Sequence, residues 1–123
     1  MDEKMTLAEV KEKVAAMRQA RGWQKELRSI AISLSLEAAE LLEHFQWDGS
    51  PVVTKGTKVA KRVRNEVEME MADVLVYLAE VANVFEVDLG KAFFKKLAKI
   101  DKKYPAGKVR KLGGKFYFQQ KGK

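Results

Sequence analysis

The sequence predicts an all-α protein, and three observations carry this prediction. Apolar residues recur at intervals of three and four along most of the 123 residues, which is the period of an α-helix. Only two prolines occur, Pro51 and Pro105, and both fall between helical segments and not inside them. Short connections join the segments, which is typical of a four-helix bundle.

The first two helices have recognisable ends. Thr6 and Glu9 have the spacing of a capping box, which predicts a helix that begins after Thr6 and ends near Gly22. A second, longer helix is expected from about residue 25 to residue 46. The turn-forming run Trp-Asp-Gly-Ser-Pro at residues 47–51 closes this second helix.

Two further helices follow the turn. After Gly56 an apolar stripe that reaches Phe85 predicts a third helix of up to about thirty residues, which we expect to pack antiparallel to the second. Asp88 is a good N-cap for a fourth helix, and Pro105 supplies its end. These helices define a predicted domain of residues 1–105.

The remaining residues, 106–123, form a basic C-terminal extension. The Gly113-Gly114 pair stands between two short apolar runs, which indicates a β-hairpin. A frayed terminus is the alternative, because an isolated hairpin is marginal in water unless it packs on something. Both interpretations stay open at the level of the sequence.

Composition limits the chemistry that the chain can perform. With 24 Lys and Arg against 17 Asp and Glu, 46% hydrophobic residues and 33% charged ones, we expect one folded basic domain of net charge +7. The absence of cysteine excludes disulfides, zinc ribbons, iron–sulfur clusters and thiol nucleophiles. A charged N-terminal segment and the lack of a long apolar run predict a cytoplasmic protein with no membrane contact. With a single histidine, any chemistry must rest on carboxylates.

Two acidic pairs are the main candidate site. Glu37 and Glu40 on the second helix, and Glu70 and Asp73 on the third, are each spaced three residues apart, so that both members share a helix face. Four carboxylates close together in apolar surroundings raise one another's pKa unless a cation binds them. Oxygen ligands favour hard ions, so the expected cofactor is Mg²⁺, with Mn²⁺ as a possible substitute.

Two alternatives compete with a metal site at these pairs. One acidic pair alone is typical of a solvated helix face, but two pairs embedded in apolar segments weaken that interpretation. A di-iron carboxylate bundle needs Glu-x-x-His on two helices, whereas His44, the only histidine, lies four residues after Glu40. We therefore set the di-iron site aside.

The motifs resemble those of the MazG-like nucleotide pyrophosphohydrolases, including their dCTP pyrophosphatase branch, from about Trp23 to Pro105. The resemblance implies a helical bundle of the MazG-like type that hydrolyses a (d)NTP to a (d)NMP and pyrophosphate, with Mg²⁺ held by the four acids, in nucleotide-pool house-cleaning. It also implies a homodimer or homotetramer. The motifs are Glu37-x-x-Glu40, Phe45-Gln46-Trp47, Glu70-x-x-Asp73 with the following Val74-Leu75-Val76-Tyr77-Leu78, and Lys103-Tyr104-Pro105.

Substrate-binding candidates divide into cations and aromatic rings. Phosphate charge that no metal meets needs basic groups, and a nucleobase needs flat faces for stacking. For each lysine, plain surface charge is the alternative, and both tryptophans could instead seal helix ends against the core. The candidates are Arg28, Lys96 and Lys103 for phosphate, with Trp23, Trp47 and Tyr77 for the base, where the resemblance associates both tryptophan positions with the base pocket.

Two features complicate this assignment. Relatives often carry an asparagine shortly before Lys-Tyr-Pro, whereas residues 99–102 read Lys-Ile-Asp-Lys, which puts the preferred base in doubt.

The charge is also uneven, since residues 91–123 carry a net +11 and residues 1–90 a net −4. The basic end could guide triphosphates to the site, or the chain could be a non-catalytic helical module that binds nucleic acid or a protein partner. We favour the enzyme, and nucleic acid is the weaker alternative.

Overall fold

The computed structural model describes residues 1–46 and 64–115. These residues contain helices and no strands, which confirms the all-α prediction. None of these helices is both long and apolar enough to span a membrane. The helices are α1 (Leu7–Ala20), α2 (Leu27–Glu43), α4 (Arg64–Val84), α5 (Leu89–Lys103) and α6 (Ala106–Leu112).

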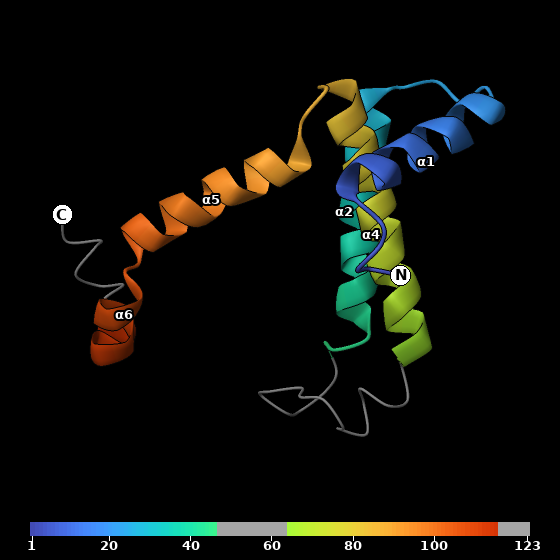
Figure 1. The fold of residues 1–123 in the computed structure, drawn as a ribbon. Helices are drawn as coiled ribbons and strands as arrows, with labels where there is room; N and C mark the ends of the chain where they lie inside the picture. Colours follow the sequence, from blue (N-terminus) through green and yellow to red (C-terminus); the bar gives the residue numbers. More distant parts are fainter. Residues whose placement is uncertain (47–63, 116–123) are drawn as a thin grey trace. The chain divides into compact units, whose positions relative to one another are not determined.

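The chain divides into two compact units, Met1–Val87 and Asp88–Lys123, and each is described by itself. In the first unit α2 and α4 run side by side in opposite directions, as predicted, and α1 crosses them (Figure 1). The first unit therefore contains three of the four helices expected in the bundle. The predicted boundary between residues 105 and 106 stays a prediction.

Side-chain caps fix where the helices begin. The backbone N–H of Thr6 donates to Glu9 Oε2 at 2.6 Å and that of Glu9 donates to Thr6 Oγ1 at 3.2 Å, which confirms the predicted capping box. Asp88 Oδ1 accepts from the backbone N–H of Lys91 at 2.9 Å, as expected of the N-cap of α5. Glu26 caps α2 in the same way, although glutamate is not among the usual N-cap residues.

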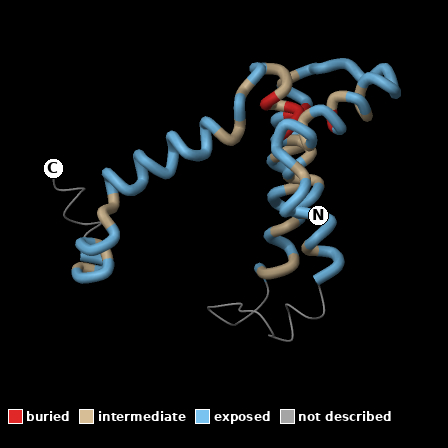
Figure 2. The backbone as a smooth tube through the Cα atoms, in the orientation of Figure 1, coloured by how far each residue is buried: buried red, intermediate tan, exposed pale blue. Residues whose placement is uncertain are grey.

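The core of the first unit is small. Its buried apolar residues are Val14 of α1, Ile30 of α2, and Ala79 and Ala82 of α4, which gather where α1 crosses the other two helices (Figure 2). The stripe that was expected to turn inward along α4 is largely uncovered in the single chain. Its exposed members include Met71, Leu78 and Phe85.

The second unit contains α5 and α6. The fourth predicted helix is confirmed as α5, with Tyr104 as its C-cap before Pro105. The hairpin alternative for the tail is wrong at residues 109–112, because they lie within α6, which ends at Gly113 with a positive φ of 56°. Residues 116–123, the proposed second half of that hairpin, and the segment 47–63 lie outside the described residues.

Candidate functional site

An acidic cluster lies between α2 and α4. One carboxylate oxygen each of Glu37, Glu70 and Asp73 lies within 4.8 Å of the other two. The antiparallel packing of α2 and α4 accounts for this, because it sets a pair on one helix opposite a pair on the other. The structure thus brings together residues from both predicted pairs, while their role as metal ligands stays a prediction.

Glu40 completes the cluster through hydrogen bonds to two of these acids. Burial raises the pKa of Glu37 to about 7, assisted by a hydrogen bond from its protonated form to Glu40 and by the charges of Glu40, Asp73 and Glu70. The pKa of Glu70 is also raised, first by burial and then by a hydrogen bond to Glu40. Near neutral pH the cluster therefore holds protons that a cation can displace.

Unsatisfied oxygens show that these residues fit a metal ion. Glu37 Oε2 and Glu70 Oε2 are buried, and neither has a hydrogen-bond partner among the described residues. A buried carboxylate oxygen without a partner is costly, whereas a hard divalent cation accepts several such oxygens at once. The donor set of four carboxylates matches Mg²⁺ or Mn²⁺ and contains no soft ligand.

His44 lies beside the cluster. Its Nε2 is 3.8 Å from Glu70 Oε1, and both side chains are about one-fifth exposed. The charge of His44 opposes the rise in the pKa of Glu70. This contact makes His44 a neighbour of a candidate metal ligand.

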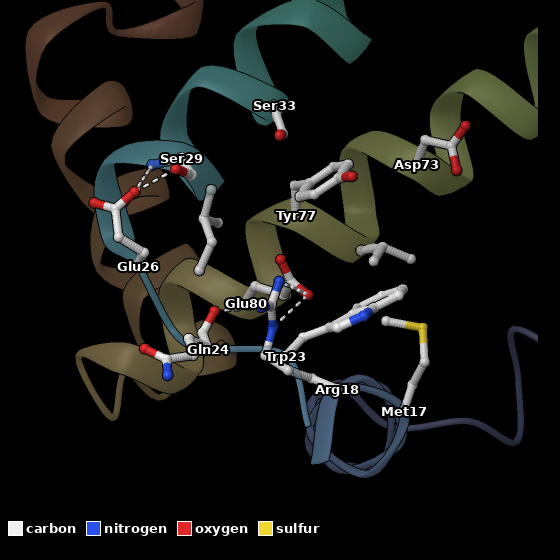
Figure 3. Close-up of a pocket in the computed structure, with 12 residues that line it drawn as sticks. Met17, Arg18, Trp23, Gln24, Glu26, Ser29, Ser33, Asp73, Tyr77 and Glu80 are labelled. Atoms are coloured by element: carbon white, nitrogen blue, oxygen red, sulfur yellow. Dashed lines mark hydrogen bonds and ion pairs between the residues drawn. The ribbon is translucent and has the colours of Figure 1, made fainter. Parts of the chain in front are cut away.

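A pocket of about 390 Å³ begins at the cluster and extends along α4 (Figure 3). Asp73 belongs to both the cluster and the pocket lining, and Tyr77 follows it one turn later on the same face. Trp23, from the segment between α1 and α2, provides a second ring. The volume lies in the range of small-molecule sites, and two aromatic rings suit a flat ligand.

The three basic residues predicted to contact phosphate are not among the described residues that line this pocket. Arg28 is exposed in the first turn of α2 and is absent from the pocket lining. Lys96 and Lys103 are exposed on α5 in the second unit, and the Lys103 ammonium lies 5.3 Å from the centre of the Tyr104 ring. Trp47 lies outside the described residues.

Sequence reasoning missed Arg18 and Glu80, an ion pair at the pocket. An acid within the apolar run Leu-Ala-Glu-Val-Ala at residues 78–82, seven residues after Asp73, was the available signal for Glu80. Nothing in the sequence could pair it with Arg18, which lies 62 residues away. The remaining lining residues are Met17, Gln24, Glu26, Ser29, Ile30, Ser33 and Val76.

The described residues form helices without strands, and two antiparallel helices carry an acidic cluster next to an aromatic pocket, which defines a helical protein with a carboxylate site. A sequence model of the MazG-like family matches residues 32–116. The chain therefore belongs to the MazG-like family, and the resemblance predicted from its motifs is confirmed.

Individual relatives agree with this assignment. The chain is 31% identical to dCTP pyrophosphatase 1 of Homo sapiens over 115 residues, which cover 90% of this chain and 66% of that protein. It is 30% identical to dCTP pyrophosphatase 1 of Bos taurus over 103 residues, 81% of this chain and 60% of that protein. The chain thus spans less than two thirds of the length of these curated relatives.

A solved structure is similar as well. The crystal structure of a pyrophosphatase from Archaeoglobus fulgidus superposes with a TM-score of 0.72 at 38% sequence identity. The match covers 80% of this chain and 92% of the other. The helical fold is therefore the fold of a known pyrophosphatase.

Proposed function

We propose that the protein is a Mg²⁺-dependent nucleoside triphosphate pyrophosphohydrolase, which converts a (d)NTP to a (d)NMP and pyrophosphate. The observation that carries the proposal is the acidic cluster that opens, at Asp73, into a pocket walled by aromatic rings. The names of the relatives, dCTP pyrophosphatase and pyrophosphatase, support the same reaction. Clearing unwanted nucleotides from the cytoplasmic pool is the corresponding role.

The four acids would act through a bound cation. Glu37, Glu40, Glu70 and Asp73 would hold Mg²⁺, or Mn²⁺ in its place, and the ion supplies charge neutralisation and an acidified water when bound. The carboxylates themselves repel a triphosphate, so their contribution is to fix the cation next to the pocket. Glu40, which is exposed and accepts hydrogen bonds from the protonated forms of Glu37 and Glu70, is the residue we assign as general base.

The pocket would seat the nucleoside. Trp23 and Tyr77 offer ring faces for a base. Tyr77 stands one turn from Asp73, so the phosphates would lie at the Asp73 end of the pocket and the base beside the two rings. Trp47 is assigned to the base through the family resemblance. Arg28, Lys96 and Lys103 are assigned to the phosphates on charge alone.

We also propose that the protein works as a homodimer or homotetramer. Only four apolar residues are buried among those described, and no large side chain there is fully buried. A chain with so much uncovered apolar surface gains stability from association with copies of itself. The exposed apolar side chains in the first unit include Ile32, Leu36, Leu42, Met69, Met71, Leu75, Leu78 and Phe85.

A product assay tests the reaction. The protein with Mg²⁺ is incubated with each ribo- and deoxyribonucleoside triphosphate, and pyrophosphate and orthophosphate are measured separately. We expect pyrophosphate from at least one triphosphate and its complete loss in EDTA. Orthophosphate as the first product contradicts the reaction class, and no turnover with any triphosphate supports the non-catalytic binding module instead.

Two isosteric variants test the site. Glu40→Gln and Asp73→Asn should each lower kcat by orders of magnitude, because each removes a proposed ligand oxygen. In EDTA both variants should melt at or above the wild-type temperature, since each removes a carboxylate from a cluster whose charges repel one another. Glu66→Gln, an exposed change in the first turn of α4, is the matched control and should leave kcat unchanged. Variants that melt well below wild type in EDTA would mean that the acids are structural.

A further inference from the structure

A buried carboxylate lies in the pocket at the far end from the acidic cluster. Glu80 is 4% exposed and lines the pocket with Tyr77 and Trp23 (Figure 3). It follows Asp73 by seven residues, or two helical turns, which corresponds to about 10 Å along the axis of α4. This separation is comparable to the length of a nucleoside from its phosphate to the outer edge of its base.

Arg18 occupies only one of the two oxygens of Glu80. The guanidinium donates to Glu80 Oε1 from Nε at 2.9 Å and from Nη2 at 2.6 Å. Its remaining nitrogen, Nη1, donates to the backbone carbonyl of Gln24 at 2.6 Å, and its centre lies 6.0 Å from the Trp23 ring. These contacts connect the carboxylate to the ring through the guanidinium.

The second oxygen of Glu80 is unsatisfied. Glu80 Oε2 is buried and has no hydrogen-bond partner among the described residues. Buried acceptors are nearly always paired, because an unpaired one loses its hydration without compensation. In a pocket that also presents two aromatic rings, the group suited to this oxygen is an N–H donor on a flat ligand.

We propose that Glu80 determines base specificity: its carboxylate accepts a hydrogen bond from the exocyclic amino group of a base held beside Trp23 and Tyr77. The protein then selects cytosine or adenine over their keto counterparts, uracil and hypoxanthine. A keto oxygen in the same place would face a carboxylate and leave both acceptors without a donor. This inference rests on the proposed function, since it assumes a nucleotide in the pocket.

A purely structural ion pair is the competing explanation, because Arg18 and Glu80 also join α1 to α4. The two explanations differ in what a change at Glu80 does to the choice of base. A structural role lowers stability and affects every substrate by the same factor. A specificity role changes the ratio between amino and keto substrates.

The experiment compares kcat/KM for dCTP with dUTP, and for dATP with dITP, in wild type and in Glu80→Gln. Wild type should prefer the amino base of at least one pair by about tenfold to a hundredfold, the range of a hydrogen bond to a charged group. The amide introduced by Glu80→Gln can keep its oxygen on Arg18 and present its NH₂ to the base, so the preference should fall by at least about tenfold. Glu66→Gln on the exposed part of α4 is the matched control and should keep the wild-type ratio.

Two further measurements decide the question if the variant folds poorly or if no triphosphate is hydrolysed. The double variant Arg18→Met/Glu80→Met replaces the buried pair with apolar side chains of similar size and should also lose the preference. Calorimetric binding of dCMP against dUMP, and of dAMP against dIMP, measures base selection without turnover. Equal binding in both pairs by wild type overturns the proposal, as does a wild-type ratio that survives Glu80→Gln or the double variant.

Discussion

Protons and metal ions should compete for the acidic cluster, and lowering the pH is the perturbation that reveals this. The pKa of Glu37 is raised to about 7 because the side chain is partly buried beside three other carboxylates, and partial burial together with neighbouring carboxylates also raises the pKa of Glu70. A divalent ion binds the deprotonated forms, so its binding releases these protons. Affinity for the ion should therefore fall as the pH falls through this range.

The expected loss of metal affinity can be calculated from the pKa of Glu37. At about pH 8 roughly nine in ten Glu37 side chains are deprotonated, and at about pH 5.5 only about three in a hundred are, which predicts binding about 30-fold weaker at the lower pH. Protonation of Glu70 adds to this factor. A cluster of carboxylates with ordinary pKa values would lose only a small part of its affinity over the same interval.

The ratio of affinities is measured by titrating the protein with Mn²⁺ at both pH values. Electron paramagnetic resonance detects the free ion in each titration. Glu37→Gln should bind more weakly at pH 8 and show a smaller dependence on pH, whereas Glu66→Gln should behave as wild type. Equal affinity at both pH values, or no saturable binding at either, would refute the reasoning.

The same shift has a consequence for the metal-free protein. A carboxyl group whose folded pKa lies above its unfolded value of about 4.5 binds more protons in the folded state between those two values. The free energy of unfolding in EDTA should therefore decrease as the pH rises from about 4.5 to about 7, and then level off. Adding Mg²⁺ at about pH 8 should recover stability that is lost there.

Three further changes test the structure outside the cluster. Thr6→Ala removes the cap of α1 and should lower the free energy of unfolding by about 1 kcal/mol in urea denaturation. Arg18→Ala leaves Glu80 buried without its partner and should cost about 3–5 kcal/mol, measured in the same way against Glu66→Gln. Glu86→Gly should keep or raise the melting temperature, because Glu86 has a φ of 53°, which glycine adopts without strain; a lower melting temperature would contradict this.

The parts of the fold that sequence predicted well are those determined locally. The capping box at Thr6 and Glu9 and the N-cap at Asp88 were predictable because each hydrogen bond joins residues three apart. The antiparallel pairing of α2 and α4 was predictable because consecutive helices with apolar stripes and a connecting turn pack side by side in opposite directions.

The parts that sequence missed depend on long-range packing or on weak local preferences. Arg18 is an ordinary basic residue near the end of an amphipathic helix until the fold brings α4 against it. In the tail, the Gly113-Gly114 pair suits a hairpin and a helix end equally, and the structure uses Gly113 as the C-cap of α6. The apolar stripe of α4 indicates burial, but periodicity does not say whether another part of the chain or another copy covers it.

One face of α4 connects the metal-binding and base-binding parts of the proposed site. Glu70, Asp73, Tyr77 and Glu80 are spaced by three, four and three residues, so they lie in a row along this face, from the cluster to the inner end of the pocket. Each residue of a helix is rotated by about 100° from the one before. Insertion of one residue between Asp73 and Tyr77 would therefore turn the Tyr77 ring and the Glu80 carboxylate away from the pocket. The acidic cluster would stay in place. In the proposed site, the register of this single helix, more than any one side chain, would therefore couple the position of the phosphates to the choice of base.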